Sequence, residues 1–265
     1  MVDLDSARIS PFDHGLTVGD GVFETLKVIG GEPFAISRHL RRLHTSATGL
    51  GLAAPNLDRV REAVSSVLEA NQAVDARLRI TLTGGLGPLG SNRDQTEPTL
   101  LVAVSELHLY SGVTKVVTVP WTRNERGAMT GIKSTSYAEN VLALAYAHER
   151  HASEAIFANT VGNLCEGTGS NIFVGIDGRL VTPPLSAGPL GGITRELILE
   201  VVDVVEEDLP LEALFEADEA FLSSSIRDVQ AISAVDDHVF DLAPGPLTKA
   251  AADALARLEA QTSDP

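Results

Sequence analysis

The sequence predicts an α+β fold of two domains, and three observations lead to this prediction. Hydrophobic residues make up 44% of the 265 residues, which is enough for a substantial core. Segments of strand-like alternation are mixed with segments of helical spacing, but they do not alternate strictly, as they would in a doubly wound sheet. Polar residues and glycine become frequent between Glu106 and Val113. We therefore expect a domain at 1–112 and a second at 113–265.

In the first half, glycine pairs mark turns, and apolar residues spaced three or four apart mark helices. Ser37 and Pro55-Asn56 stand where helix starts are expected, because such residues cap or open helices. The expected elements are, in order, a loop at 13–21, a strand at 22–29, a hairpin turn at 30–31, a helix capped by Ser37, a helix after Asn56, a strand at 77–83, a glycine-rich loop at 84–90 and a strand at 99–104.

In the second half the helix after Lys133 is expected to bury the stripe Tyr137, Val141, Leu144, Ala145 and His148. Asp177-Gly178 is typical of a hairpin turn. The other expected elements are, in order, strands at 115–120 and 154–159, a strand ending in a loop at 163–171, a hairpin at 172–181, a helix opening at Gly191–Thr194, a strand at 220–222 and a C-terminal helix from about Thr248.

Charge and composition narrow the class of protein. The formal net charge of −16 repels nucleic acid and anionic membrane surfaces, so neither is an expected partner. No apolar run approaches the roughly 18 residues that span a bilayer. The first residues lack the features of a signal peptide, and the single cysteine, Cys165, suits a reducing compartment. We expect a cytoplasmic protein that acts on a small molecule.

Four features carry candidate chemistry, and each also has a plain structural interpretation. Lys133 is either a solvated residue before a helix or a partly buried amine able to form a Schiff base. Glu166 lies on an exposed hairpin, or it faces a ring nitrogen from a loop rich in small residues. Gly191–Thr194 is an ordinary helix start or a phosphate site, and Arg42 is a solvated arginine or a phosphate ligand.

The order and spacing of these features resemble one family, the class IV aminotransferases, which are pyridoxal 5′-phosphate (PLP) enzymes of fold type IV. The motifs that carry this resemblance are Gly19–Thr25, His39-Leu40 with Arg42-Leu43, Lys133, Glu166-Gly167 with Ser170–Phe173, and Gly192–Arg195. The family comprises branched-chain aminotransferase, D-amino-acid aminotransferase and aminodeoxychorismate lyase. The resemblance implies two α/β domains with PLP at their interface and a homodimer that shares residues between active sites. It implies no metal.

Carried over to this sequence, the resemblance implies that Lys133 is the catalytic residue, holding PLP through its amine and later moving protons. Glu166 would keep the pyridine nitrogen protonated, so that the ring accepts electrons. The residues expected around the phosphate are Arg42, Ile193, Thr194, Ser224 and Ser225. Tyr137 would bond the ring hydroxyl, although its spacing from the lysine differs between branches. Phe23 would line the substrate side, and Cys165 would be a small packing residue.

Within the family, the motifs Gly19–Thr25, Ser136–Leu142 and Ser224–Gln230 most resemble aminodeoxychorismate lyase. That reaction would release pyruvate and leave 4-aminobenzoate for folate synthesis. The alternatives are an aminotransferase acting on D- or branched-chain amino acids and a non-catalytic relative that binds PLP or a metabolite as a sensor. One departure stands out: Gly84 and Leu89 occupy places where D-amino-acid aminotransferases and familiar lyases carry arginine. Arg93 and Arg227 are the candidates to bind the substrate carboxylate instead.

Overall fold

The computed structural model describes residues 2–93, 97–108, 110 and 112–265, and the chain forms two compact units. Unit 1 consists of Met1–His108, Ile132–Tyr137 and Asp264. Unit 2 consists of Leu109–Gly131, Ala138–Ser263 and Pro265. The segment that carries Lys133 therefore clusters with the N-terminal part of the chain, although it lies within the stretch 113–265.

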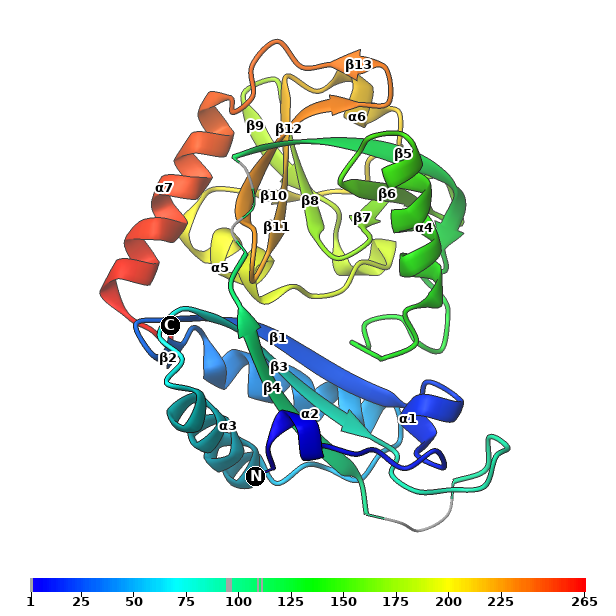
Figure 1. The fold of residues 1–265 in the computed structure, drawn as a ribbon. Coiled ribbons are helices and arrows are strands. Elements are labelled where there is room, and N and C mark those ends of the chain that lie inside the picture. The colour runs from blue at the N-terminus through cyan, green and yellow to red at the C-terminus, as the bar shows by residue number, and fades with distance from the viewer. Residues whose placement is uncertain (1, 94–96, 109, 111) are drawn as a thin grey trace. The chain divides into compact units, whose positions relative to one another are not determined.

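Unit 1 is a four-stranded antiparallel sheet with helices on one face (Figure 1). Its elements are η1 (Leu4–Ser6), α1 (His14–Thr17), β1 (Gly21–Ile29), β2 (Glu32–Pro33), α2 (Ile36–Gly49), α3 (Leu57–Asn71), β3 (Ala76–Thr83) and β4 (Thr99–Glu106), with strand order β2-β1-β3-β4. Leu26 and Leu78 pack with residues of α2 and α3 in the core. Because strand side chains alternate between faces, Phe23 of β1 and Arg79 of β3 lie on the face away from that core.

The start of α2 differs from the expectation that Ser37 would cap it. The N-cap is Ala35, in the left-handed conformation with φ 55°, and its side chain offers no acceptor. Ser37 lies inside the first turn, where its N–H and hydroxyl donate to the Asp264 carboxylate at 2.9 and 2.5 Å. A carboxylate from the end of the chain thus does for this helix what a capping side chain usually does.

Unit 2 is built on a nine-stranded mixed sheet (Figure 1). The strand order is β10-β9-β8-β11-β12-β5-β6-β7, with β13 beside β12, and β12, β5 and β6 are parallel neighbours. The elements are β5 (Val113–Arg123), α4 (Ala138–Glu149), β6 (Glu154–Asn159), β7 (Leu164–Gly167), β8 (Asn171–Ile176), β9 (Arg179–Thr182), η2 (Leu185–Ala187), α5 (Ile193–Val201), β10 (Val205–Glu206), α6 (Ala213–Glu216), β11 (Glu219–Ser224), β12 (Asp228–Val235), β13 (His238–Val239) and α7 (Pro246–Gln261). The parallel and antiparallel strands of this sheet confirm the predicted α+β class. One of the strands, β12, was not predicted from the sequence patterns.

Helix α4 buries a different stripe from the expected one, so that prediction was wrong. Ala143 and Ala147 are the fully buried residues, and they pack with Val117 and Phe157 of the sheet. Val141, which was expected to be inside, is 66% exposed. Small alanines let the helix lie close to the sheet, whereas the larger side chains of Val141 and Leu142 are exposed in this single chain.

Within the described part of the chain, no helix combines the length and apolarity needed to cross a membrane.

Candidate active site

Lys133 lies on a short extended segment that runs beside β1 within unit 1. The Phe23 N–H donates to the Lys133 carbonyl at 3.0 Å, and the Thr135 N–H donates to the Gly21 carbonyl at 2.8 Å. The Lys133 N–H is bound by the hydroxyl of Ser46 in α2 at 3.2 Å. The backbone at this half-buried lysine is therefore fixed from two sides.

The amine of Lys133 lies over an aromatic pair. Its Nζ is 4.5 Å from the centroid of the Phe23 ring, and the ring of Tyr137 meets Phe23 edge-on with centroids 5.1 Å apart. Phe23 is only 5% exposed. The structure thus brings together three residues that the sequence singled out, and it places the amine against a desolvating surface rather than in bulk water.

Arg79 belongs to the same group, and sequence reasoning missed it. Its guanidinium carbon lies 3.8 Å from the centroid of the Phe23 ring. Within the described residues its one hydrogen bond runs from Nε to the Thr81 hydroxyl at 3.2 Å, and it forms no ion pair with a carboxylate. Partial burial lowers the pKa of this arginine. The sequence does contain a signal for Arg79. In the two-residue alternation of β3 its side chain is on the face opposite Leu78 and Ile80.

Arg42 is held by a buried carboxylate, Glu24 of β1. Arg42 Nε and Nη2 donate to the two oxygens of Glu24 at 2.9 and 2.6 Å, and His39 Nδ1 lies 2.6 Å from Glu24 Oε2. Burial by itself raises the pKa of Glu24, but Arg42 and His39 outweigh it and lower that pKa to about 2. Burial lowers the pKa of His39, so its ring is neutral and donates from Nδ1. The expected phosphate role of Arg42 stays a prediction.

In unit 2, Glu166 has a partner at each carboxylate oxygen. Arg123 Nε lies 3.2 Å from Oε1, and the Leu190 N–H donates to Oε2 at 2.9 Å. The Arg123 guanidinium also stacks on the Phe157 ring, 4.0 Å from its centroid. Both side chains of the pair are 14% exposed. The guanidinium therefore orients the Glu166 carboxylate, and sequence reasoning did not find Arg123.

The N-terminus of α5 offers backbone donors that fit an anion. Its N-cap is Gly192, and within the described residues no side chain caps this end of the helix. A Cβ at Gly192 would collide with the Asn171 side chain, so a glycine is required there. Ile193 and Thr194 are each 5% exposed. The N–H groups of this first turn carry the positive end of the helix dipole.

The serines at the end of β11 form a second polar group in unit 2. Ser224 ends the strand, and Ser225 follows it directly. Ser223 Oγ is buried and has no hydrogen-bond partner within the described residues. A buried hydroxyl without a partner is uncommon and indicates a place where a ligand oxygen or water can bind.

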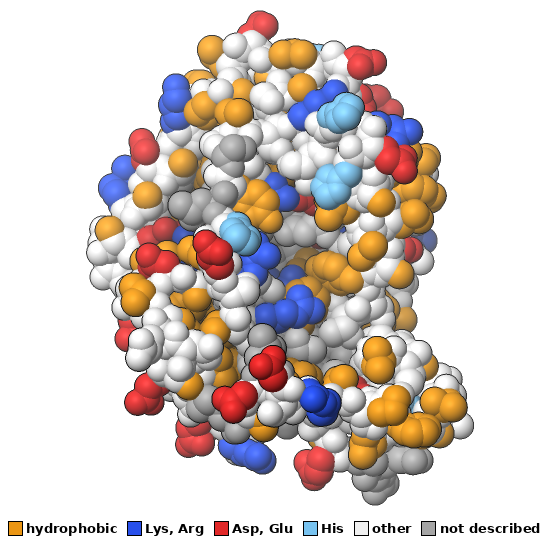
Figure 2. Space-filling view, viewed as in Figure 1, with side chains coloured by type: hydrophobic (Ala, Val, Ile, Leu, Met, Phe, Trp, Pro, Cys, Tyr) orange, Lys and Arg blue, Asp and Glu red, His pale blue; other side chains and the backbone are white. Residues whose placement is uncertain are grey.

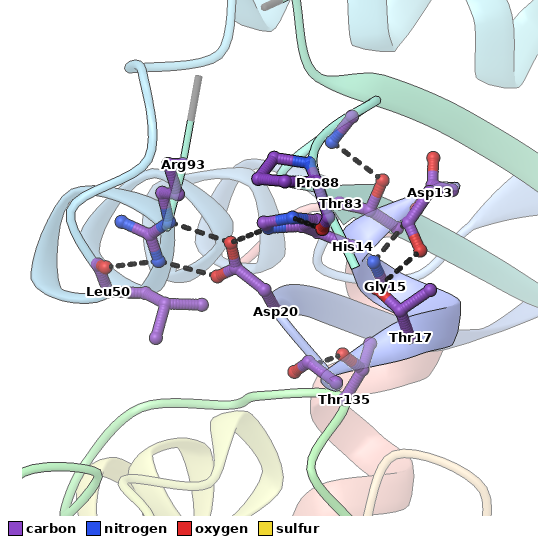
Figure 3. Close-up of polar contacts among 12 residues, drawn as sticks. Asp13, His14, Gly15, Thr17, Asp20, Leu50, Thr83, Pro88, Arg93 and Thr135 are labelled. Atoms are coloured by element: carbon purple, nitrogen blue, oxygen red, sulfur yellow. Dashed lines mark hydrogen bonds and ion pairs between the residues drawn. The ribbon is translucent and has the colours of Figure 1, made fainter. Parts of the chain in front are cut away.

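The two arginines proposed for the substrate carboxylate both have carboxylate partners inside the chain. Arg93 binds Asp20 through Nε and Nη2 at 2.7 and 2.5 Å, and it also donates to the Leu50 carbonyl (Figure 3). Arg227 lies 2.5 Å from Glu154 and donates to Gln230. Neither guanidinium is therefore as open to a substrate carboxylate as Arg79 is, and both assignments stay predictions.

Cys165 is buried beside Glu166 and is 1% exposed. Burial and the neighbouring carboxylate raise the pKa of its thiol, so the sulfur stays protonated and unreactive. This state fits a packing residue.

Comparisons with known proteins agree with the geometry. The sequence model of the family described as "Amino-transferase class IV" matches residues 21–235. A putative branched-chain-amino-acid aminotransferase of Methanocaldococcus jannaschii is 33% identical, over 91% of this chain and 87% of the relative. An aminodeoxychorismate lyase of Bacillus subtilis is 30% identical over 92% and 87%, and a D-alanine aminotransferase of Bacillus licheniformis is 29% identical over 94% and 91%.

A solved structure of a hypothetical aminotransferase from Mycobacterium tuberculosis, in a PLP-bound form, superimposes with a TM-score of 0.86. It is 26% identical and covers 96% of this chain and 94% of its own. Each unit, taken by itself, offers groups that suit this cofactor. Unit 1 has the Lys133 amine over the Phe23 ring. Unit 2 has the Glu166 carboxylate with its two partners and, within the described residues, a helix start without a side-chain cap and a Ser223 hydroxyl without a hydrogen-bond partner.

Proposed function

The chain belongs to the class IV aminotransferase family of PLP enzymes, and on that premise we propose that it is a 4-amino-4-deoxychorismate lyase. The reaction removes pyruvate from 4-amino-4-deoxychorismate and leaves the aromatic ring of 4-aminobenzoate, a precursor of folate. The observation that carries the reaction class is the Lys133 amine, held 4.5 Å from the Phe23 ring by a segment bonded on both sides.

PLP supplies a ring that accepts an electron pair when a bond at the substrate's amine-bearing carbon breaks. Lys133 Nζ would hold the cofactor and would serve as the base for the proton of that carbon. Glu166, oriented by Arg123, would face the pyridine nitrogen and keep its proton in place. The N–H groups of Ile193 and Thr194, with the serines at the end of β11, would bind the phosphate.

Arg79 is the residue of unit 1 that we assign to a substrate carboxylate. Its guanidinium shares the Phe23 ring with the lysine amine, and within the described residues it forms no ion pair with a carboxylate. A guanidinium binds a carboxylate through two parallel hydrogen bonds. The substrate carries carboxylates and a six-membered ring, which suits an arginine beside the aromatic pair Phe23 and Tyr137.

An aminotransferase on the same scaffold is the second candidate. The branched-chain and D-alanine relatives are as similar to this chain as the lyase is. Both reactions need the lysine, the carboxylate at the ring nitrogen and a carboxylate-binding arginine. What favours the lyase is the local similarity of the motifs Gly19–Thr25, Ser136–Leu142 and Ser224–Gln230.

The deciding experiment supplies aminodeoxychorismate to the purified protein and measures pyruvate with and without 2-oxoglutarate. The lyase releases pyruvate in the absence of any keto-acid acceptor. Turnover that requires the acceptor, or that occurs with D-alanine or leucine instead, would replace the proposal with the aminotransferase.

The role of Lys133 has a separate test. Borohydride should fix PLP to Lys133, which peptide mass spectrometry detects, and Lys133→Ala should lose both the label and turnover while its circular dichroism spectrum stays unchanged. Lys249→Ala, at an exposed position of α7, is the matched control and should behave as wild type. A colourless, unlabelled wild-type protein would remove the enzyme proposal.

The homodimer and the cytoplasmic location expected from the sequence stay predictions. Light scattering after size-exclusion chromatography measures the oligomeric state.

A further inference from the structure

The glycine-rich loop at 84–90, between β3 and β4, is held by polar contacts rather than by an apolar core. The Gly84 N–H donates to the Asp20 carbonyl at 2.8 Å, and the Gly87 N–H donates to the Phe12 carbonyl at 3.0 Å. Leu86 and Leu89 are 52% and 71% exposed, in the region around α1 where Figure 2 shows hydrophobic side chains gathered on the surface. No buried side chain of the loop therefore anchors it, and its position depends on hydrogen bonds and charge.

Asp20 lies at the centre of these contacts and holds both ends of the loop (Figure 3). Its carbonyl binds Gly84 at the start, and its carboxylate, 9% exposed, binds Arg93 just beyond the end through two hydrogen bonds. Arg93 Nη2 also donates to the Leu50 carbonyl at 2.9 Å. We call the pair Asp20 and Arg93 the clasp. A two-pronged ion pair of this kind fixes direction as well as distance.

His14 adds a second attachment on the same side of the loop. Its Nε2 lies 2.9 Å from the Pro88 carbonyl, and its backbone N–H donates to the Gly85 carbonyl at 2.8 Å. The imidazole Nδ1 lies 3.7 Å from the Asp20 carboxylate, so the histidine bridges the clasp and the middle of the loop.

The glycines of the loop are explained by these contacts. A Cβ at Gly84 would lie 2.5 Å from Asp20 Oδ2, and one at Gly87 would collide with the His14 ring. A side chain at position 84 and the clasp therefore exclude each other, because both need the same space. This gives a physical reason for a glycine at the place where the sequence comparison expected an arginine.

The clasp is also next to the segment that carries the reactive lysine. Asp20 lies between Gly19, whose carbonyl accepts from the Thr135 hydroxyl at 3.0 Å, and Gly21, whose carbonyl accepts from the Thr135 N–H. Two residues further on, Phe23 bonds the Lys133 carbonyl. One short stretch of backbone thus connects the loop on one side with the Lys133 segment on the other.

We propose that Asp20 and Arg93 are positioning residues that fix the 84–90 loop relative to the Lys133 segment, and that this fixed loop sets how the substrate is held. Arg93 then acts through the loop and does not itself bind the substrate carboxylate. The part that concerns substrate rests on the proposed function, whereas the part that concerns the loop does not.

Hydrogen exchange followed by mass spectrometry tests the loop directly in the full-length, PLP-loaded protein. Arg93→Gln should speed exchange in peptides covering 84–92 by about tenfold, because the amides there lose their bracing. Arg93→Lys keeps the positive charge but cannot form the two parallel hydrogen bonds, so its loop should exchange at a rate between those of wild type and Arg93→Gln. Arg59→Gln, the same change at an exposed position of α3, should leave the loop as in wild type.

Gly84→Ala should disturb the same contact between Asp20 and Arg93 without changing any charge, and it should speed exchange in the same peptides. Unchanged exchange in both Arg93→Gln and Gly84→Ala would overturn the proposal. So would faster exchange spread evenly over all of unit 1, which would indicate general destabilisation.

Steady-state kinetics with aminodeoxychorismate tests the effect on substrate. Arg93→Gln should raise KM by about tenfold and leave kcat within about twofold, because the loop holds substrate without touching the reacting atoms. A fall in kcat at unchanged KM would overturn the positioning role. If the wild-type protein shows no turnover, the proposed function fails, and the exchange experiment still decides whether the clasp holds the loop.

Discussion

Replacing Glu24 with glutamine gives the sharpest stability prediction, because this carboxylate is fully buried between Arg42 and His39. Its pKa falls from the usual 4.5 to about 2 in the folded protein. A difference of about 2.5, at ~1.36 kcal/mol for each pKa unit, corresponds to about 3 kcal/mol of stability at neutral pH. Glu24→Gln should therefore lower the free energy of unfolding by about 3 kcal/mol at pH 7.

The stability difference between wild type and Glu24→Gln should depend on pH. A carboxyl group whose pKa is lowered by folding stabilises the protein above pH 4.5, and this contribution is lost as the pH falls towards 2. Wild type and Glu24→Gln should therefore converge on acidification, and the gap between them should shrink by about 2 kcal/mol from pH 7 to pH 3.

Urea unfolding followed by circular dichroism at the two pH values measures the gap. Glu62→Gln, on the exposed side of α3, is the matched control and should change stability by no more than about 0.5 kcal/mol at either pH. If the gap for Glu24→Gln were the same at pH 7 and pH 3, an ionised carboxylate would not be its source, and the argument would be wrong.

Three further predictions follow from the site and the core. Arg123→Leu should weaken PLP binding by about tenfold, because Glu166 loses its guanidinium partner; absorbance after dialysis measures the bound PLP. Arg123→Lys should recover part of the affinity. Equal PLP affinities of wild type and Arg123→Leu would contradict this role of Arg123. The Cys165 thiol should react with a disulfide reagent on the order of 100-fold more slowly in the folded protein than in denaturant, and equal rates would disprove its burial. Ala143→Leu should destabilise α4 packing by about 1–3 kcal/mol, whereas Ala145→Leu on the exposed side of the same helix should change stability little; equal thermal shifts would refute the observed stripe.

Sequence patterns predicted the strands of unit 1 well because one face of its sheet is buried and the other is polar. Leu78 and Ile80 alternate with Arg77 and Arg79, as a half-buried strand requires. The stripe of α4 was not predictable in the same way. Its buried face is made of alanines and its exposed positions include larger apolar residues, so a rule that places the most hydrophobic face inwards selects the wrong side.

The site shows the same limit. Lys133 and Glu166 could be singled out as candidates because their motifs are ordered along the chain, but the residues that contact them in the structure come from distant positions. Arg123 precedes Glu166 by 43 residues, and nothing in either local sequence joins the two. Buried charges such as Glu24 are likewise invisible to hydropathy, because only the packed structure shows that Arg42 compensates for the loss of water.

Unit 1 is assembled from segments that are far apart in the sequence, which affects the order in which it can form during translation. Its sheet is encoded before residue 107, yet Val22 of β1 pairs with Ser134 only when residues 132–137 have been synthesised, and the first turn of α2 binds the carboxylate of Asp264. A chain that ends at residue 112 therefore leaves Val22 of β1 without its bridge to Ser134 and does not contain Lys133. We therefore expect a fragment ending at residue 112 to be prone to aggregation.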